Sequence, residues 1–141
     1  MIKYVTKDFY LENYGSKFIP EDLIEIFLKK AQNEVEDYCA NGIRRVLFRY
    51  IDEKELDNYK TLDEFQEDKN VLSDFEIELL KETICETANF LYENNDAIKG
   101  IVTSMSANGA SVTFSKSDIN STKNYIISKN LDMTRFTNAI I

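Results

Sequence analysis

One long amphipathic stretch, from Ser73 to Asp96, constrains the fold more than any other part of the sequence. Ser73 followed by Glu76 matches a capping box, in which each side chain accepts a hydrogen bond from the other residue's backbone N–H. Apolar residues then recur at steps of three and four, the period of a helix: Ile77, Leu80, Ile84, Ala88 and Leu91. Flanking positions widen this stripe: Leu79, Thr83 and Phe90. We therefore predict a long central helix with neighbours on more than one side.

Two amphipathic helices are predicted before the central one. Thr6 can cap a short helix from Lys7 to Tyr14, which Gly15 ends. Its inward residues would be Val5, Phe9 and Tyr10. Pro20 favours a helix start, so a second helix is predicted to about Cys39. One face of this second helix is apolar: Ile24, Phe27, Leu28, Ala31, Val35 and Tyr38. The residues away from it are polar: Glu25, Lys29, Gln32 and Glu36.

The next part of the chain is harder to interpret. Segment 43–50 fits a helical face through Ile43, Val46, Leu47 and Tyr50, but its β-branched and aromatic residues also suit a strand. Segment 52–69 is predicted to be a charged connector with room for one short helix. A calcium loop does not fit there, because Leu62 would stand where the loop needs glycine.

After the central helix the residue types change. Segment 101–115 is rich in small and β-favouring residues around Asn108-Gly109, a strong signal for a two-residue hairpin turn. A last helix is predicted from Ser117 or Asp118 to about Leu131. Four of its residues are available for burial: Ile119, Tyr125, Ile126 and Ile127. Residues 132–141 form a C-terminal tail with several apolar residues. The sequence thus predicts one domain, 1–131, followed by that tail.

Composition excludes several classes of function. A chain of 141 residues is the size of one domain, and its net charge of −8 argues against a protein that grips nucleic acid. It has no histidine, and Cys39 and Cys85 match no metal-binding spacing, so both cysteines are interpreted as small buried hydrophobes. No phosphate loop or nucleophile motif is present. We predict no catalytic residue, no metal site and no cofactor.

One basic cluster stands out in this acidic chain: Arg44, Arg45 and Arg49. It can contact an acidic partner or DNA phosphates. It can also form ion pairs with neighbouring acids such as Asp52 or Glu53.

The order of these signals resembles the head–tail connector (adaptor) proteins of tailed bacteriophages. The resemblance runs from about Tyr4 to Leu131: a short opening helix, the helix IPEDLIEIFLKKAQNEVEDYC, a charged linker, the helix LLKETICETANFLYEN, the serine-rich MSANGASVTFS and a closing helix. Its most characteristic part is the central helix followed directly by the serine-rich hairpin.

The resemblance implies a structural protein. Such adaptors form a ring, commonly a dodecamer, beneath the portal of the filled capsid. The ring extends the DNA channel, through which DNA passes without specific binding, and offers a platform for the next neck (stopper) or tail-completion protein. The location would be the virion neck, after assembly in the cytoplasm of the bacterial host, with no membrane involved. An acidic wall suits such a channel, because like charge disfavours phosphate binding.

Three sets of residues carry hypotheses under this interpretation. Portal docking is assigned to apolar residues of the closing helix and tail: Ile126, Ile127, Leu131, Met133, Phe136, Ile140 and Ile141. Contact with an adjacent subunit or the next neck component is assigned to the hairpin tip: Ala107, Asn108, Gly109 and Ala110. Ion pairs between subunits, with the acidic connector, are assigned to Arg44, Arg45 and Arg49.

The expected fold is mostly α: a helical bundle around a long central helix, with one protruding β-hairpin and a C-terminal helix plus tail. Two other functions stay open on the sequence. One is a small acidic helical regulator that binds a protein partner. The other is an enzyme that uses carboxylates alone with a divalent metal.

Overall fold

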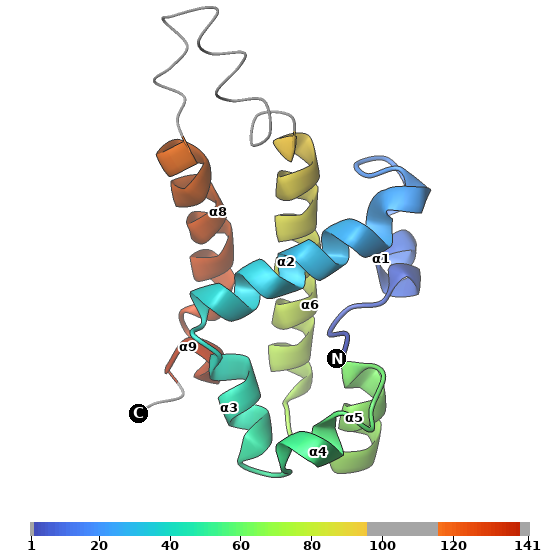
Figure 1. The fold of residues 1–141 in the computed structure, drawn as a ribbon, viewed down its shortest axis with the longest axis vertical. Helices are drawn as coiled ribbons and strands as arrows, with labels where there is room; N and C mark the ends of the chain where they lie inside the picture. The colour runs from blue at the N-terminus through green and yellow to red at the C-terminus, as the bar shows by residue number, and fades with distance from the viewer. Residues whose placement is uncertain (1, 96–115, 139–141) are drawn as a thin grey trace, which may run out of the picture.

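The computed structural model describes residues 2–95 and 116–138, which form helices packed around one long helix (Figure 1). The described chain is mostly helical, as predicted, and its only β pairing is an isolated bridge between Lys3 and Thr61. The predicted hairpin at 101–115 lies outside the described residues. In chain order the helices are α1 (Lys7–Tyr14), α2 (Ile24–Tyr38), α3 (Gly42–Phe48), α4 (Glu53–Leu56), α5 (Leu62–Lys69), α6 (Asp74–Glu93), α8 (Lys116–Leu131) and α9 (Arg135–Asn138).

Helix α6 is the predicted central helix. Its capping box is complete, because Ser73 Oγ accepts a hydrogen bond from the Glu76 N–H at 3.1 Å and Glu76 Oε1 accepts one from the Ser73 N–H at 3.0 Å. Helix α2 packs on one side of α6 and α8 on another, as the wide stripe indicated. The buried residues of α6 are Leu80, Thr83, Ile84, Cys85, Thr87, Ala88 and Leu91.

Helices α1 and α2 follow the predicted pattern with one correction. Thr6 Oγ1 accepts a hydrogen bond from the Phe9 N–H at 3.2 Å, and Gly15 has φ +64°, a conformation that favours glycine. The second predicted helix does not start directly at Pro20, because a 3-10 turn at Glu21–Leu23 precedes α2. The predicted apolar face of α2 is buried except for Tyr38, which is half-buried.

The ambiguous segment 43–50 is helical as far as Phe48, the end of α3. Tyr50, which was predicted to share the helical face, follows the helix and is exposed. Ile43, Val46 and Leu47 are all fully buried, at the spacing of one helical face, so the strand interpretation is wrong. The charged connector contains two short helices, α4 and α5, where the sequence suggested one. Each begins at a side-chain cap, Asp52 for α4 and Thr61 for α5.

Helix α8 runs antiparallel to α6. Lys129 lies 2.9 Å from Glu86, and Asn130 donates a hydrogen bond to Thr83 at 3.2 Å, so the pairing moves backward along α6 as α8 advances. The end of α6 and the start of α8 therefore lie at the same end of the bundle, where residues 96–115 connect them (Figure 1).

Part of the predicted tail belongs to the core. Residues 135–138 form α9, which packs on α3, and Phe136 is fully buried in the same hydrophobic cluster as the other helices. Tyr125 was predicted to be available for burial, but it is 65% exposed, whereas Ile119 and Ile127 are buried.

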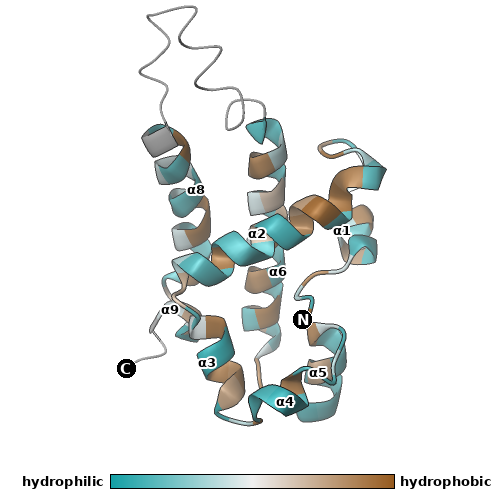
Figure 2. Cartoon of the chain, viewed as in Figure 1, coloured by the Kyte–Doolittle hydropathy of each residue, from teal (hydrophilic) through white to brown (hydrophobic). Residues whose placement is uncertain are grey.

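The hydropathy pattern explains this packing. Figure 2 shows brown and teal residues alternating along α2 and α6, as expected for helices with one apolar stripe. One leucine of each short helix reaches the same core, because Leu56 at the end of α4 and Leu62 at the start of α5 are buried although both helices are otherwise mostly hydrophilic. One continuous core therefore extends from segment 2–5 to α9.

Candidate functional site

A buried polar network holds the N-terminal segment against α2 and α3. Tyr4 Oη donates a hydrogen bond to Glu36 Oε1 at 2.5 Å, and Arg44 Nε donates to the same oxygen at 3.0 Å. Gln32 accepts from the Tyr4 backbone N–H and donates to the Ile2 carbonyl, both at 2.8 Å. The network thus joins three elements that are distant in the sequence.

The burial of Gln32 and Glu36 corrects a prediction. The sequence placed both on the polar face of α2, yet they are only 7% and 6% exposed, because segment 2–5 covers that part of the helix. Burial, reinforced by the Glu36 carboxylate, raises the pKa of Tyr4 well above its ordinary value, so the phenol stays a hydrogen-bond donor. We interpret the network as structural, since its two charged side chains, Glu36 and Arg44, pair with each other inside the fold.

The three arginines of the basic cluster occupy different surroundings. Arg44 points into the core and pairs with Glu36 of its own chain, and not with the Asp52 or Glu53 that the sequence suggested. Arg45 is exposed, and its Nη1 donates to the Ala40 carbonyl at 2.8 Å. Arg49 is exposed and also interacts within the chain. Only Arg45 and Arg49 can therefore reach a second molecule readily.

A second ion pair fastens the C-terminal helix to the central helix. The Arg135 guanidinium donates two hydrogen bonds of 2.7 Å to the Glu76 carboxylate, one to each oxygen, and a third of 3.3 Å to the Val71 carbonyl. Glu76 is the same residue that completes the capping box of α6. The bond from Arg135, followed by the backbone N–H of Ser73, lowers the pKa of Glu76.

We expect this pair to weaken in acid. A carboxylate whose pKa is lower in the folded protein than its ordinary 4.5 contributes stability that is complete above that value and is lost as the pH falls through the folded-state pKa. Glu76→Gln keeps the capping hydrogen bond, because glutamine also serves in a capping box, but removes the ion pair. Urea unfolding should therefore give wild type a larger free energy of unfolding than Glu76→Gln at about pH 7, and this difference should shrink at about pH 3.

The control for this measurement is Glu78→Gln, which removes an exposed carboxylate from the same helix and so makes the same change in net charge. If the difference in unfolding free energy between wild type and Glu76→Gln were the same at both pH values, the role assigned to the Arg135–Glu76 pair would be wrong.

The described residues that were assigned to portal docking divide into two groups. Ile127, Leu131 and Phe136 are fully buried in the core, so they are not available to a partner in this fold. Met133, by contrast, is 92% exposed between α8 and α9, and Ile126 is half-buried. Ile140 and Ile141 lie outside the described residues, as do the hairpin residues Ala107, Asn108, Gly109 and Ala110. The docking assignment requires apolar side chains that are exposed. Met133 meets this requirement, whereas the three buried residues do not.

Large apolar side chains are exposed near the α3 side of the molecule. Phe48 is 37% exposed and Tyr50 is 55% exposed, directly beside the exposed Arg45 and Arg49. Tyr50 also interacts with Arg135 of α9. Aromatic residues and arginines with this exposure are typical of protein–protein contact surfaces. The sequence had marked the arginines of this surface but not its aromatic side chains.

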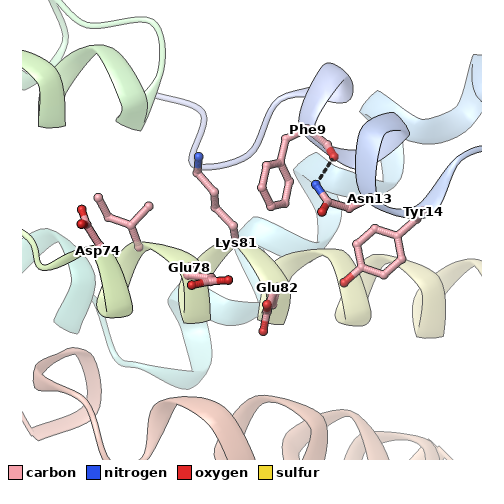
Figure 3. A pocket seen from close by; sticks show the side chains of 8 residues that line it. Phe9, Asn13, Tyr14, Asp74, Glu78, Lys81 and Glu82 are labelled. Carbon is pink, nitrogen blue, oxygen red and sulfur yellow. Dashed lines mark hydrogen bonds between the residues drawn. The ribbon is translucent and has the colours of Figure 1, made fainter.

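A groove of about 400 Å³ lies between α1 and α6. Figure 3 shows Phe9, Asn13 and Tyr14 of α1 on one wall and the carboxylates of Glu78 and Glu82 along α6 on the other. Asp74 lines its end. Lys81 also lines the groove, but its ammonium lies 2.6 Å from Asp63 and 4.8 Å from the centre of the Phe9 ring. The groove is thus acidic with an aromatic wall, which sequence reasoning missed because α1 and α6 are distant in the chain.

No group of three acidic or cysteine side chains among residues 2–95 and 116–138 is close enough to hold a metal ion. Cys39 and Cys85 are free and buried, as predicted, and burial raises the pKa of each thiol to about 12.

No family model, curated protein or solved structure matches this chain. Among the helices that the structure describes, none is long and apolar enough to cross a membrane.

Proposed function

We propose that this chain is a head–tail connector of a tailed bacteriophage, which forms a ring below the portal and extends the DNA channel. The observation that carries the proposal is the arrangement of α6 and α8. These antiparallel helices bring both ends of segment 96–115 to one end of the bundle, while α9 packs toward the other (Figure 1). A subunit with two distinct ends of this kind suits a protein that joins two neighbours.

The proposal places the predicted β-hairpin, with its tip at Asn108-Gly109, at the α6–α8 end. There it contacts an adjacent subunit or the next neck or tail-completion protein. The C-terminal region docks on the portal. The net charge of −8 supports a channel through which DNA slides without adhering, because like charges repel.

The experiment that tests the function is negative-stain imaging of the purified protein mixed with matching DNA-filled, tailless heads. We expect added ring density at the single portal vertex of each head. Bare vertices, with folded protein in excess, would reject the connector and favour a small acidic regulator that binds a protein partner.

Met133 is the exposed residue at which docking on the portal can be tested. Met133→Glu should leave the fold intact, because the side chain is 92% exposed, but should reduce ring occupancy on heads at least about tenfold by placing a charge in an apolar contact. Thermal unfolding and vertex occupancy are the two measurements.

The matched control is Tyr125→Glu, which introduces the same charge at another exposed apolar residue, 65% exposed on α8 and outside the assigned docking set. Equal occupancy for Met133→Glu and wild type would remove Met133 from the docking surface. Deletion of residues 132–141 is a poor test, because it also removes the buried Phe136.

A further inference from the structure

Two helices of this chain carry columns of like charge with opposite sign. On α6, Glu78 and Glu82 stand one turn apart along the α1–α6 groove, with Asp74 one turn before them. On the α3 side, Arg45 and Arg49 also stand one turn apart, since Arg49 continues the helical conformation at φ −68° and ψ −19°. Like charges four residues apart destabilise a helix by a few tenths of a kcal/mol, so neither column is explained by the stability of its own helix.

The two columns match in spacing. Residues four apart on a helix are separated by about 6 Å along its axis, so Arg45 and Arg49 can face Glu78 and Glu82 one to one. The forked guanidinium can donate to several acceptors at once, so the intrachain contacts of both arginines are compatible with a second carboxylate. The aromatic residues match as well, because Phe48 and Tyr50 beside the arginines would meet the wall of Phe9 and Tyr14.

The α1–α6 groove and α3 lie on opposite sides of α6. Successive residues of a helix are about 100° apart, so Glu76 lies about 160° around α6 from Asp74. Asp74 lines the groove, whereas Glu76 holds Arg135 of α9, and α9 packs on α3. Figure 1 likewise shows α1 and α3 on different sides of α6. A two-fold dimer cannot use both faces of each subunit for this pairing, so the contact must be head-to-tail and propagate to a ring or a filament.

We infer that the α3 surface formed by Arg45, Phe48, Arg49 and Tyr50 docks into the α1–α6 groove of a second copy of this chain. The inference deepens the proposed function and rests on it for the closure of the contact into a ring. The sequence had predicted that the arginines pair with the acidic segment 52–69 of another subunit. In this inference, the acidic α1–α6 groove takes the place of that segment. The inference also leaves Arg44 out, because that side chain already pairs with Glu36.

The test uses two charge-reversed variants of the full chain. The first is Arg45→Glu with Arg49→Glu, and the second is Glu78→Lys with Glu82→Lys. We expect wild-type protein to sediment as species larger than a monomer at about 100 μM, and each variant alone to bind its own copies at least about 100-fold more weakly, because like charges then face each other. An equimolar mixture should assemble again, since each reversed surface then meets its complement.

Recovery in the mixture separates the inference from misfolding, because a misfolded variant cannot be rescued by a second one. The control pair reverses charges outside the contact. Lys29→Glu mixed with Glu67→Lys, both at exposed positions, should sediment as wild type does. Raising the salt from about 0.1 M to about 1 M, which shortens the Debye length from about 10 Å to about 3 Å, should dissociate the wild-type assembly.

A wild-type protein that stays monomeric up to about 1 mM would overturn the inference, as would a mixture no larger than either variant alone. The imaging of heads separates this failure from failure of the proposed function. Rings at the vertices that form equally well with both reversed variants would reject this contact and leave the connector intact. Bare vertices together with recovery in the mixture would support the contact and reject the connector.

Discussion

Replacing Gly42 by alanine is expected to lower the free energy of unfolding by about 3 kcal/mol, although alanine is the better helix former by about 1 kcal/mol. Gly42 is the first residue of α3, and the backbone of α9 lies directly against it. A Cβ atom at this position would stand 1.6 Å from the Phe136 carbonyl oxygen and 2.8 Å from its carbon. These are backbone atoms, so no side-chain rotation can relieve the clash, and α9 must move.

The movement of α9 gives the prediction a second signature. Phe136 is fully buried and Arg135 holds Glu76, so displacing α9 should expose an aromatic ring and release the ion pair at the start of α6. Hydrogen exchange should accelerate at the amides of α9 and of the first turn of α6, while those of α1 keep their protection.

Gly15→Ala is the control for Gly42→Ala. A Cβ at Gly15 would meet no atom within 4 Å, so its cost is limited to the positive φ of +64°, about 1 kcal/mol. If Gly42→Ala were no more destabilising than Gly15→Ala, the close packing of α3 and α9 would not exist in solution.

Glu36→Ala is expected to destabilise the fold by about 3 kcal/mol. The substitution removes the acceptor of both Tyr4 Oη and Arg44 Nε, and it leaves the Arg44 guanidinium without its ion-pair partner in a largely buried site. One Arg44 nitrogen, Nη2, is already buried and has no hydrogen-bond partner among the described residues, so the variant adds to an existing deficit. Urea or thermal unfolding measures the loss.

Two variants make this prediction specific. Glu25→Ala on the same helix removes an exposed carboxylate that lies 3.8 Å from Lys3, and it should change stability by less than about 0.5 kcal/mol. Glu36→Leu combined with Arg44→Met replaces the pair by apolar side chains and should recover most of the lost stability, because no buried charge is then left alone. A loss for Glu36→Ala as small as that for Glu25→Ala would refute the network.

Local sequence patterns determined the central helix of this protein. The capping box at Ser73 and Glu76, the apolar steps of α6 and the cap at Thr6 act over a few residues, so each could be recognised without knowing the neighbours. The same holds for the buried face of α2 and for the mostly helical class. The proposed connector function comes from the order of these helices, and the imaging of heads is its test.

The remaining features depend on contacts between distant segments. Segment 43–50 was equally compatible with a helix and a strand until α9 and the core covered one face of α3. The spacing of Glu36 along α2 places it with the polar residues of that helix. It is buried and bonded to Tyr4 only because the N-terminal segment lies over it. In the sequence, Phe136 lies in an apparent tail. It is buried because Gly42, which has no Cβ, lets the backbone of α9 pack against α3.

The candidate interaction surfaces divide in the same way. The sequence by itself determined that Arg45 and Arg49 form a basic cluster, because they stand four residues apart on one face. Only the tertiary structure decided that Arg44 turns inward to pair with Glu36 and that α1 and α6 enclose an acidic groove. It also decided that this groove and α3 lie on opposite sides of α6. The physical reason is that helical periodicity fixes which residues share a face, whereas the packing of distant segments fixes what each face meets.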